Sequence, residues 1–225
     1  MPLTYRRNQL EWALWQLFAL NTPAADSPLV FRNRIKRLLD LDRDLGPKDE
    51  LGFGYAYFDD EGPGLGAEVE YSLYCAFAVA LGLDLLDAGF KQSEVVAICR
   101  ACRTELESYF KLALKKPPVP AEDVLAKDRR GCPTYQRNGV DYADCWIFMV
   151  MQKIGLTESL PGDAEAQKED QLLVPQFFRG RAKLHKELDS MPSHYRKAFV
   201  IEIAEIAVLV TSHLEQAPLI KRGRK

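Results

Sequence analysis

The chain has 225 residues, of which 47% are hydrophobic, and its formal net charge at pH 7 is −2. This length and apolar content suffice for one large or two small packed domains. The charge balance excludes a uniformly basic coat, so any nucleic-acid binding requires a local cationic face. The N-terminus lacks the apolar core of a secretory signal and no apolar run approaches about 18 residues, so we expect a cytoplasmic protein without membrane association.

The first predicted helix covers residues 8–20 and is apolar on more than one side. One face carries leucine and alanine at helical spacing, whereas Trp12 and Trp15 point away from that face. A helix of this kind is normally enclosed, so the tryptophans are expected to pack in the core of the chain or against another protein. Pro23 follows the helix and stops it, because proline lacks a backbone N–H and restricts the preceding residue.

A second helix is predicted over residues 28–44, and it carries the strongest charge signal in the sequence. Apolar residues at spacing i, i+4, i+7 and i+8 bury one side: Phe31, Ile35, Leu38 and Leu39. The outward arc is rich in hydrogen-bond donors and is predicted to contact DNA: Arg32, Asn33, Arg34, Lys36 and Arg37.

Side chains of these types can read duplex DNA. In the major groove arginine pairs with guanine edges and asparagine with adenine, while lysine binds phosphates. From residue 30 to residue 37 there are four cations and no anion. The alternative is an ordinary solvated face, because Asp40, Asp42 and Asp44 follow closely and could pair with the same cations.

Residues 53–71 are predicted to form a β-hairpin. The extended aromatic stretch Phe53–Phe58 is followed by turn residues and then by the alternating stretch Ala67–Tyr71. The intervening Gly62–Gly66 matches neither a dinucleotide fingerprint nor a P-loop, and it has no lysine to meet a phosphate. We therefore interpret it as a loop tip.

Two helices are predicted after the hairpin. Ser72 is placed to cap the first, which covers residues 73–88, and apolar residues surround it. Gly89 supplies the left-handed residue that ends it. The second helix starts again at Ser93 and runs to about Leu114, where prolines follow.

This order of elements resembles the second half of the DNA-binding domain of MerR-type regulators. The resemblance falls within residues 28–110 and is carried by Tyr71-Ser72, Ala88-Gly89-Phe90 and Glu94-Val95-Val96-Ala97-Ile98. In that family a basic helix before the wing reads the major groove, the wing contacts the DNA backbone, and the proteins act as dimers on promoter DNA. The resemblance implies that Arg32, Arg34, Lys36 and Arg37 occupy the reading helix, with Tyr55 and Tyr57 on the wing.

The five cysteines are odd in number and lie in apolar surroundings, which favours reduced thiols over a disulfide framework. Cys99 and Cys102 have the Cys-x-x-Cys spacing that can bind zinc or run redox chemistry. No second such pair exists, and the three histidines lie far along the chain. Because both thiols fall on the apolar stripe of their helix, we predict core packing, with no metal site and no cofactor.

The second half of the chain gives weaker signals. Residues 115–131, rich in proline and charge, are the best candidate for an interdomain linker. Residues 142–154 contain a continuous apolar run that fits a buried strand or a buried helix. A final helix is predicted over residues 193–216, and it is too apolar for the surface of a monomer. It either completes a second core or forms a two-fold dimer contact.

No sequence motif for catalysis is present. Glu202 and Glu205 would share one face of the final helix, and paired buried carboxylates can act as acid and base or hold a metal. No histidine accompanies them at the required spacing, and such carboxylates also arise from structural pairing. The sequence therefore favours a protein that is not an enzyme.

Together these patterns predict a mainly α protein with two domains. Residues 1–116 form a winged-helix-like DNA-binding domain with a small β-hairpin, and residues 132–225 form a mostly helical dimerisation or sensing domain. The expected function is sequence-specific transcriptional regulation by a homodimer on double-stranded promoter DNA. The alternative is a protein–protein interaction module without nucleic-acid affinity, in which the Trp12 and Trp15 face and the hairpin bind a partner protein.

Overall fold

The chain divides into two compact units, residues 1–117 with 204–225 and residues 118–203. This division differs from the predicted one, because the last helix belongs with the first unit. The computed structural model describes residues 4–19, 27–48, 52–59, 69–118, 126–127, 133–134, 136–137, 140–141, 144–153, 175–190 and 197–218.

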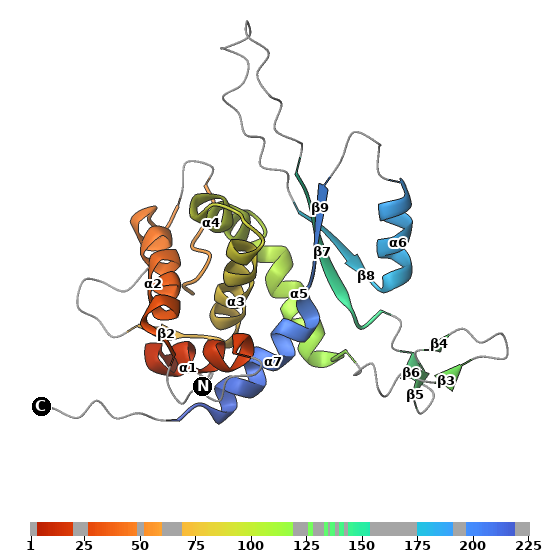
Figure 1. Cartoon of the computed structure of the whole chain (residues 1–225), viewed down its shortest axis with the longest axis horizontal. Helices are drawn as coiled ribbons and strands as arrows, with labels where there is room; N and C mark the ends of the chain where they lie inside the picture. Colours follow the sequence, from red (N-terminus) through yellow and green to blue (C-terminus); the bar gives the residue numbers. More distant parts are fainter. Residues whose placement is uncertain are drawn as a thin grey trace, which may run out of the picture. The chain divides into compact units, whose positions relative to one another are not determined.

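The first unit is mainly helical. Its described helices are α1 (Arg7–Phe18), α2 (Leu29–Asp44), α3 (Leu73–Asp87), α4 (Gln92–Ala101), α5 (Arg103–Lys115) and α7 (Ile203–Gln216). α3 is the central helix, since it contacts α1, α2, α4 and α5 (Figure 1). The helix predicted from Ser93 to Leu114 is two helices, α4 and α5, which meet at Cys102.

The sequence of α3 explains its central position. Eleven of its residues are buried, as expected for a helix that is apolar on all sides. Ser72 caps it, with Oγ accepting a hydrogen bond from the backbone N–H of Cys75 at 3.2 Å. After the helix, Gly89 has a φ of 90°, a conformation that favours glycine. The predicted cap and stop are both confirmed.

A short antiparallel strand pair links the N-terminus to the start of α3. β1 (Tyr5–Arg6) pairs with β2 (Glu70–Tyr71), and Tyr5 stands opposite Tyr71. The predicted hairpin is therefore wrong. The return strand pairs with the N-terminus, and residues 53–58 form no strand.

At Gly82 of α3 the side chains of neighbouring segments pack closely against the helix backbone. Tyr57 is fully buried, and its hydroxyl would lie 2.7 Å from a Cβ atom placed at Gly82. Side-chain carbons of Leu38 and Val95 would lie 3.2 and 3.4 Å from the same point. Glycine is therefore the residue that fits here without moving its neighbours.

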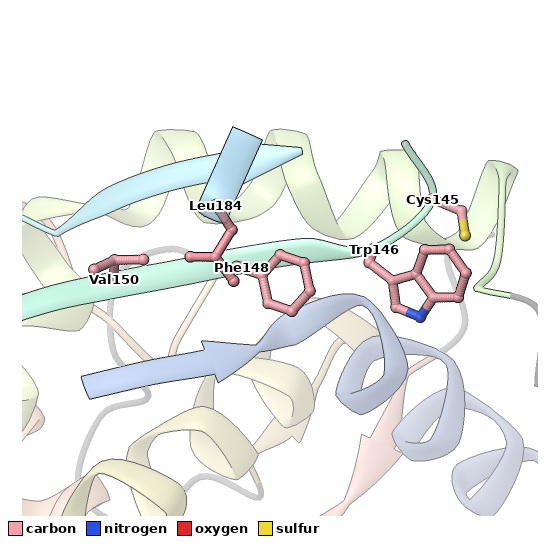
Figure 2. Packing of buried hydrophobic residues seen from close by; sticks show 5 residues of the cluster. All are labelled: Cys145, Trp146, Phe148, Val150 and Leu184. Atoms are coloured by element: carbon pink, nitrogen blue, oxygen red, sulfur yellow. The ribbon is translucent and has the colours of Figure 1, made fainter. Parts of the chain in front are cut away.

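The second unit contains a three-stranded antiparallel sheet and one described helix. The sheet has the order β8 (Gln176–Arg179), β7 (Ile147–Lys153), β9 (Lys197–Glu202), and α6 (Arg181–Ser190) follows β8. Figure 2 shows Phe148 and Val150 of β7 beside Leu184 of α6, with Trp146 just before the strand; all four belong to one buried cluster. Two short antiparallel pairs precede the sheet: β3 (Ala126–Lys127) with β4 (Pro133–Thr134), and β5 (Gln136–Arg137) with β6 (Val140–Asp141).

The final helix predicted over residues 193–216 is only partly correct. Residues 197–202 form β9, which pairs with β7, and the helix begins at Ile203. Phe199, Val200 and Ile201 are aromatic and β-branched, so their local preference suits a strand once β7 offers backbone partners. The described part of the second unit is therefore not mostly helical, although the chain is mainly helical with small antiparallel sheets.

The described helices are all too short or too polar to cross a bilayer. The predicted linker begins at Lys115, which is the last residue of α5. Most of that linker, residues 115–131, lies outside the described residues.

Candidate nucleic-acid interface

α2 has the two-sided character that its sequence predicts. Its apolar stripe is buried, with exposed fractions of 8% or less: Phe31, Ile35, Leu38 and Leu39. The opposite side carries the exposed residues that we call the α2 face: Arg32, Asn33, Lys36 and Arg37. The fifth predicted residue of this helix, Arg34, is half-buried.

Ion pairing separates Arg34 from the other cations. Arg34 Nη2 donates to the carboxylate of Asp87, the last residue of α3. Arg32, Lys36 and Arg37 form no ion pair with any residue that the structure describes. Three exposed cations are therefore available to an anionic ligand.

The aspartates after this cluster have partners of their own. Asp40 Oδ1 lies 3.6 Å from Arg43 Nη1. Asp42 is fully buried and pairs with Arg100 of α4. These two carboxylates therefore pair with cations outside the α2 face.

A fully buried ion pair fixes the C-terminal end of α2. Arg100 Nε donates to Asp42 Oδ1 at 2.6 Å, and both side chains are 0% exposed. Arg100 also donates to the backbone carbonyls of Asp42, Gly46 and Phe53. Burying two charges is costly, and the cost is offset only when such additional hydrogen bonds are made.

Asp42 also binds the segment predicted as the first wing strand. Its Oδ1 and Oδ2 accept hydrogen bonds from the backbone N–H groups of Ala56 and Tyr57, at 3.1 and 2.9 Å. Arg103 of α5 donates to the carbonyls of Tyr55, at 2.5 Å, and Phe58. Buried backbone groups need partners, and here side chains supply them in place of a neighbouring strand. The segment is thus bonded to side chains of α2 and α5, while β2 pairs with β1.

The two tyrosines predicted on the wing face the interior. Tyr57 is fully buried, so it offers no surface to a ligand, and burial raises the pKa of its hydroxyl. Tyr55 is half-buried; its ring meets Phe58 edge-on at 5.5 Å and lies 5.5 Å from the Arg100 guanidinium. The structure therefore does not bring these rings to the α2 face.

Sequence reasoning missed the role of Asp42 and Arg100. A signal was present, because Asp42 stands four residues after Leu38 and seven after Ile35, on the buried side of α2. Arg100 likewise follows Val96 by four residues. Opposite charges on the apolar faces of two helices indicate a buried pair.

The prediction that Cys99 and Cys102 pack in the core is confirmed, because both are buried and free. The described residues contain no cluster of three or more side chains that could hold a metal ion. Burial raises the pKa of Cys99 to about 12 and that of Cys102 to about 11. These thiols are therefore protonated at neutral pH and unsuited to nucleophilic chemistry.

The two C-terminal carboxylates do not share a helical face. Glu202 lies at the end of β9, and its Oε1 accepts a hydrogen bond from the backbone N–H of Ile147 at 3.1 Å. Glu205 lies in the first turn of α7 and is exposed. The prediction that Glu202 and Glu205 share one face of the final helix is therefore wrong.

No protein-family model, curated protein or solved structure matches this chain. The resemblance to MerR-type regulators stays a prediction from the sequence. Function is argued below from the fold and from the charges of the described residues.

Proposed function

We propose that this chain binds duplex DNA through the α2 face and regulates transcription from promoter DNA as a homodimer. The observation that carries the proposal is the set of three exposed cations, Arg32, Lys36 and Arg37, that no described carboxylate neutralises. Cations placed against phosphates release counterions from DNA, which favours binding. A local patch suffices for this, even in a chain of net charge −2.

The dimensions of α2 suit this role. Sixteen residues give a helix about 24 Å long, and the major groove is about 12 Å wide and admits an α-helix. α3 and α4 pack against the buried side of α2, and Gln92 Nε2 donates to the backbone carbonyl of Arg37. The buried side of α2 is therefore fixed by its neighbours, while the cations on the opposite side stay exposed. The MerR-type resemblance would give the same helix the reading role.

The homodimer follows from the size of the recognition surface. One helix face covers only a few base pairs, which is too short a site to distinguish a promoter from the rest of a genome. Two copies related by a two-fold axis would read two half-sites about 34 Å apart.

Fluorescence anisotropy with labelled duplex DNA over a range of salt concentrations tests the proposal. We expect affinity to fall steeply with salt, and Arg32→Ala/Lys36→Ala/Arg37→Ala to reduce the log–log slope by about 2 to 3 per chain, or about 5 for the homodimer, since each phosphate contact contributes about 0.9. Lys111→Ala/Lys115→Ala/Lys183→Ala removes three exposed cations elsewhere and is the matched control. It should leave the slope nearly unchanged.

The outcomes separate the proposal from its alternative. Equal losses in both triple variants would mean that general charge, and not the α2 face, drives binding. No salt-dependent binding at all would favour the protein–protein interaction module. Trp12 and Trp15 are both half-buried, and Trp15 packs edge-on against Phe31 at 5.2 Å. That face therefore gives the alternative little support.

A further inference from the structure

An apolar side chain stands beside the cations at the start of α2. Val30 is 73% exposed, the most exposed of the large hydrophobic residues that the structure describes. Asn33 and Arg37 follow it by three and seven residues, so the three share one strip of the helix. Burying Val30 against an apolar group of a ligand would remove this surface from water.

The strip differs from its surroundings in chemistry. Arg32 and Lys36 stand four residues apart on the neighbouring edge of the helix, where their charges can bind phosphates. The strip itself presents one aliphatic group, one amide and one guanidinium over about 10 Å, the length of about three base-pair steps. This arrangement matches the DNA major groove. The cations at the edge would meet the phosphates that line the groove, and the strip would meet the uncharged base edges on its floor.

The major-groove floor offers one apolar group, the C5-methyl of thymine. Asparagine pairs with adenine and arginine with guanine on the same floor. The cations at the edge of the strip favour an anionic occupant, and duplex DNA is an anionic polymer whose groove floor also offers an apolar group. Val30 then faces the methyl group.

We infer that Val30 determines sequence specificity by contacting a thymine methyl group in the major groove. This inference rests on the proposed function and adds to it the base that the first turn of α2 selects. The neighbouring Asn33 and Arg37 would contact the next bases along the site.

Deoxyuridine substitution tests the inference, because uracil lacks only the methyl group of thymine. High-affinity duplexes are first selected from a random pool with the full chain, and each thymine is then replaced in turn. We expect one position in each half-site at which the replacement weakens wild-type binding about fourfold, the factor for one buried methyl group. Val30→Ala should be insensitive to the replacement at that position.

Leu29→Ala is the matched control. Leu29 is 64% exposed and points about 100° away from Val30, on the side of the helix that carries Asn33 and Lys36. This variant should keep the wild-type response to deoxyuridine at the Val30 position, and loss of the response in Leu29→Ala but not in Val30→Ala would overturn the inference. Both positions are exposed, so neither variant threatens folding. Salt-dependent duplex binding with no sensitive thymine, or equal sensitivity in Val30→Ala, would overturn the inference and leave the proposed function standing. A pool that yields no enriched duplex would overturn both.

Discussion

Asp42 and Arg100 join α2 to α4 through an ion pair with no exposed surface, and the same carboxylate holds the backbone of residues 56 and 57. Arg100→Met removes the cation and leaves a buried carboxylate without its charge partner. We expect a loss of about 3 to 5 kcal/mol in the free energy of unfolding, measured by urea denaturation. Asp40→Asn breaks an exposed pair instead and should cost less than about 1 kcal/mol. Equal effects would show that the buried pair has no special structural role.

Gly82→Ala tests the close approach of Tyr57. Alanine is the better helix former by about 1 kcal/mol, but its Cβ would meet the Tyr57 hydroxyl at 2.7 Å. We expect the clash to dominate, with a net loss of about 1 to 3 kcal/mol. In a Tyr57→Phe background the hydroxyl is absent, so Gly82→Ala should be tolerated much better. The same loss in both backgrounds would assign the clash to Leu38 or Val95.

The unfolding free energy should depend on Asp84 between about pH 4 and pH 6. Burial, and then the neighbouring Asp87, raises the pKa of the Asp84 carboxyl from 3.8 to about 6. The folded state therefore binds more protons than the unfolded state in this window, and stability falls as pH rises through it. Asp84→Asn should be more stable than wild type at pH 7, by on the order of 1 to 2 kcal/mol after solvent screening.

That difference should shrink as the pH falls and approach zero below about pH 3, where the wild-type carboxyl is protonated in both the folded and the unfolded state. Urea unfolding at several pH values measures it. A gain that is the same at pH 4 and pH 7 would contradict the titration of Asp84.

The buried thiols should resist thiol reagents until the protein unfolds. Burial raises the pKa of Cys75 and Cys99 to about 12, so thiolate is scarce at pH 8. Cys132→Ser removes the cysteine that lies outside the described residues. In this background we expect reaction with an aromatic disulfide reagent to be far slower in the native protein than in denaturant, as followed by absorbance. Rapid native reaction would show that these thiols are accessible.

Asp87→Ala should strengthen DNA binding. The substitution releases Arg34 from its ion pair and removes a negative charge beside α2. One added phosphate contact in each chain would raise affinity about two- to fivefold per chain and steepen the salt slope by about 0.9 per chain, or about 2 for the homodimer. Asp189→Ala removes an exposed carboxylate from α6 and is the control for net charge. If both variants bind equally more tightly, Arg34 has no part in the interface.

The helices could be predicted from sequence because their signals are local. Three such signals are the apolar stripe from Phe31 to Leu39, the Ser72 cap and the Gly89 stop. Each of them depends only on residues that are close together in sequence. The strand partner of Tyr71 could not be predicted in this way, because that partner is Tyr5, which is far away in sequence. Continuous apolar runs are also ambiguous, and one such run contains the end of β9 and the start of α7.

The exposure of Arg32, Lys36 and Arg37 could be predicted from helical periodicity alone. The ion pair of Arg34 could not, because Asp87 is brought to it by the packing of α3. The burial of Tyr57 depends on Asp42, Arg103 and Gly82, which come from three different helices. An aromatic stretch bounded by turn residues favours a strand by local preference. In this chain, side chains that are distant in sequence hydrogen-bond to the backbone of that stretch instead.

Tyr5 and Tyr71 face each other across β1 and β2, and the whole α1–α2 pair lies between them in sequence. Such a long-range pairing loses loop-closure entropy before it gains any contact. The contacts of Trp15 and Phe18 with Phe31 are much more local. We therefore expect α1 and α2 to associate early in folding. The β1–β2 pair, whose strands lie far apart in sequence, should form later.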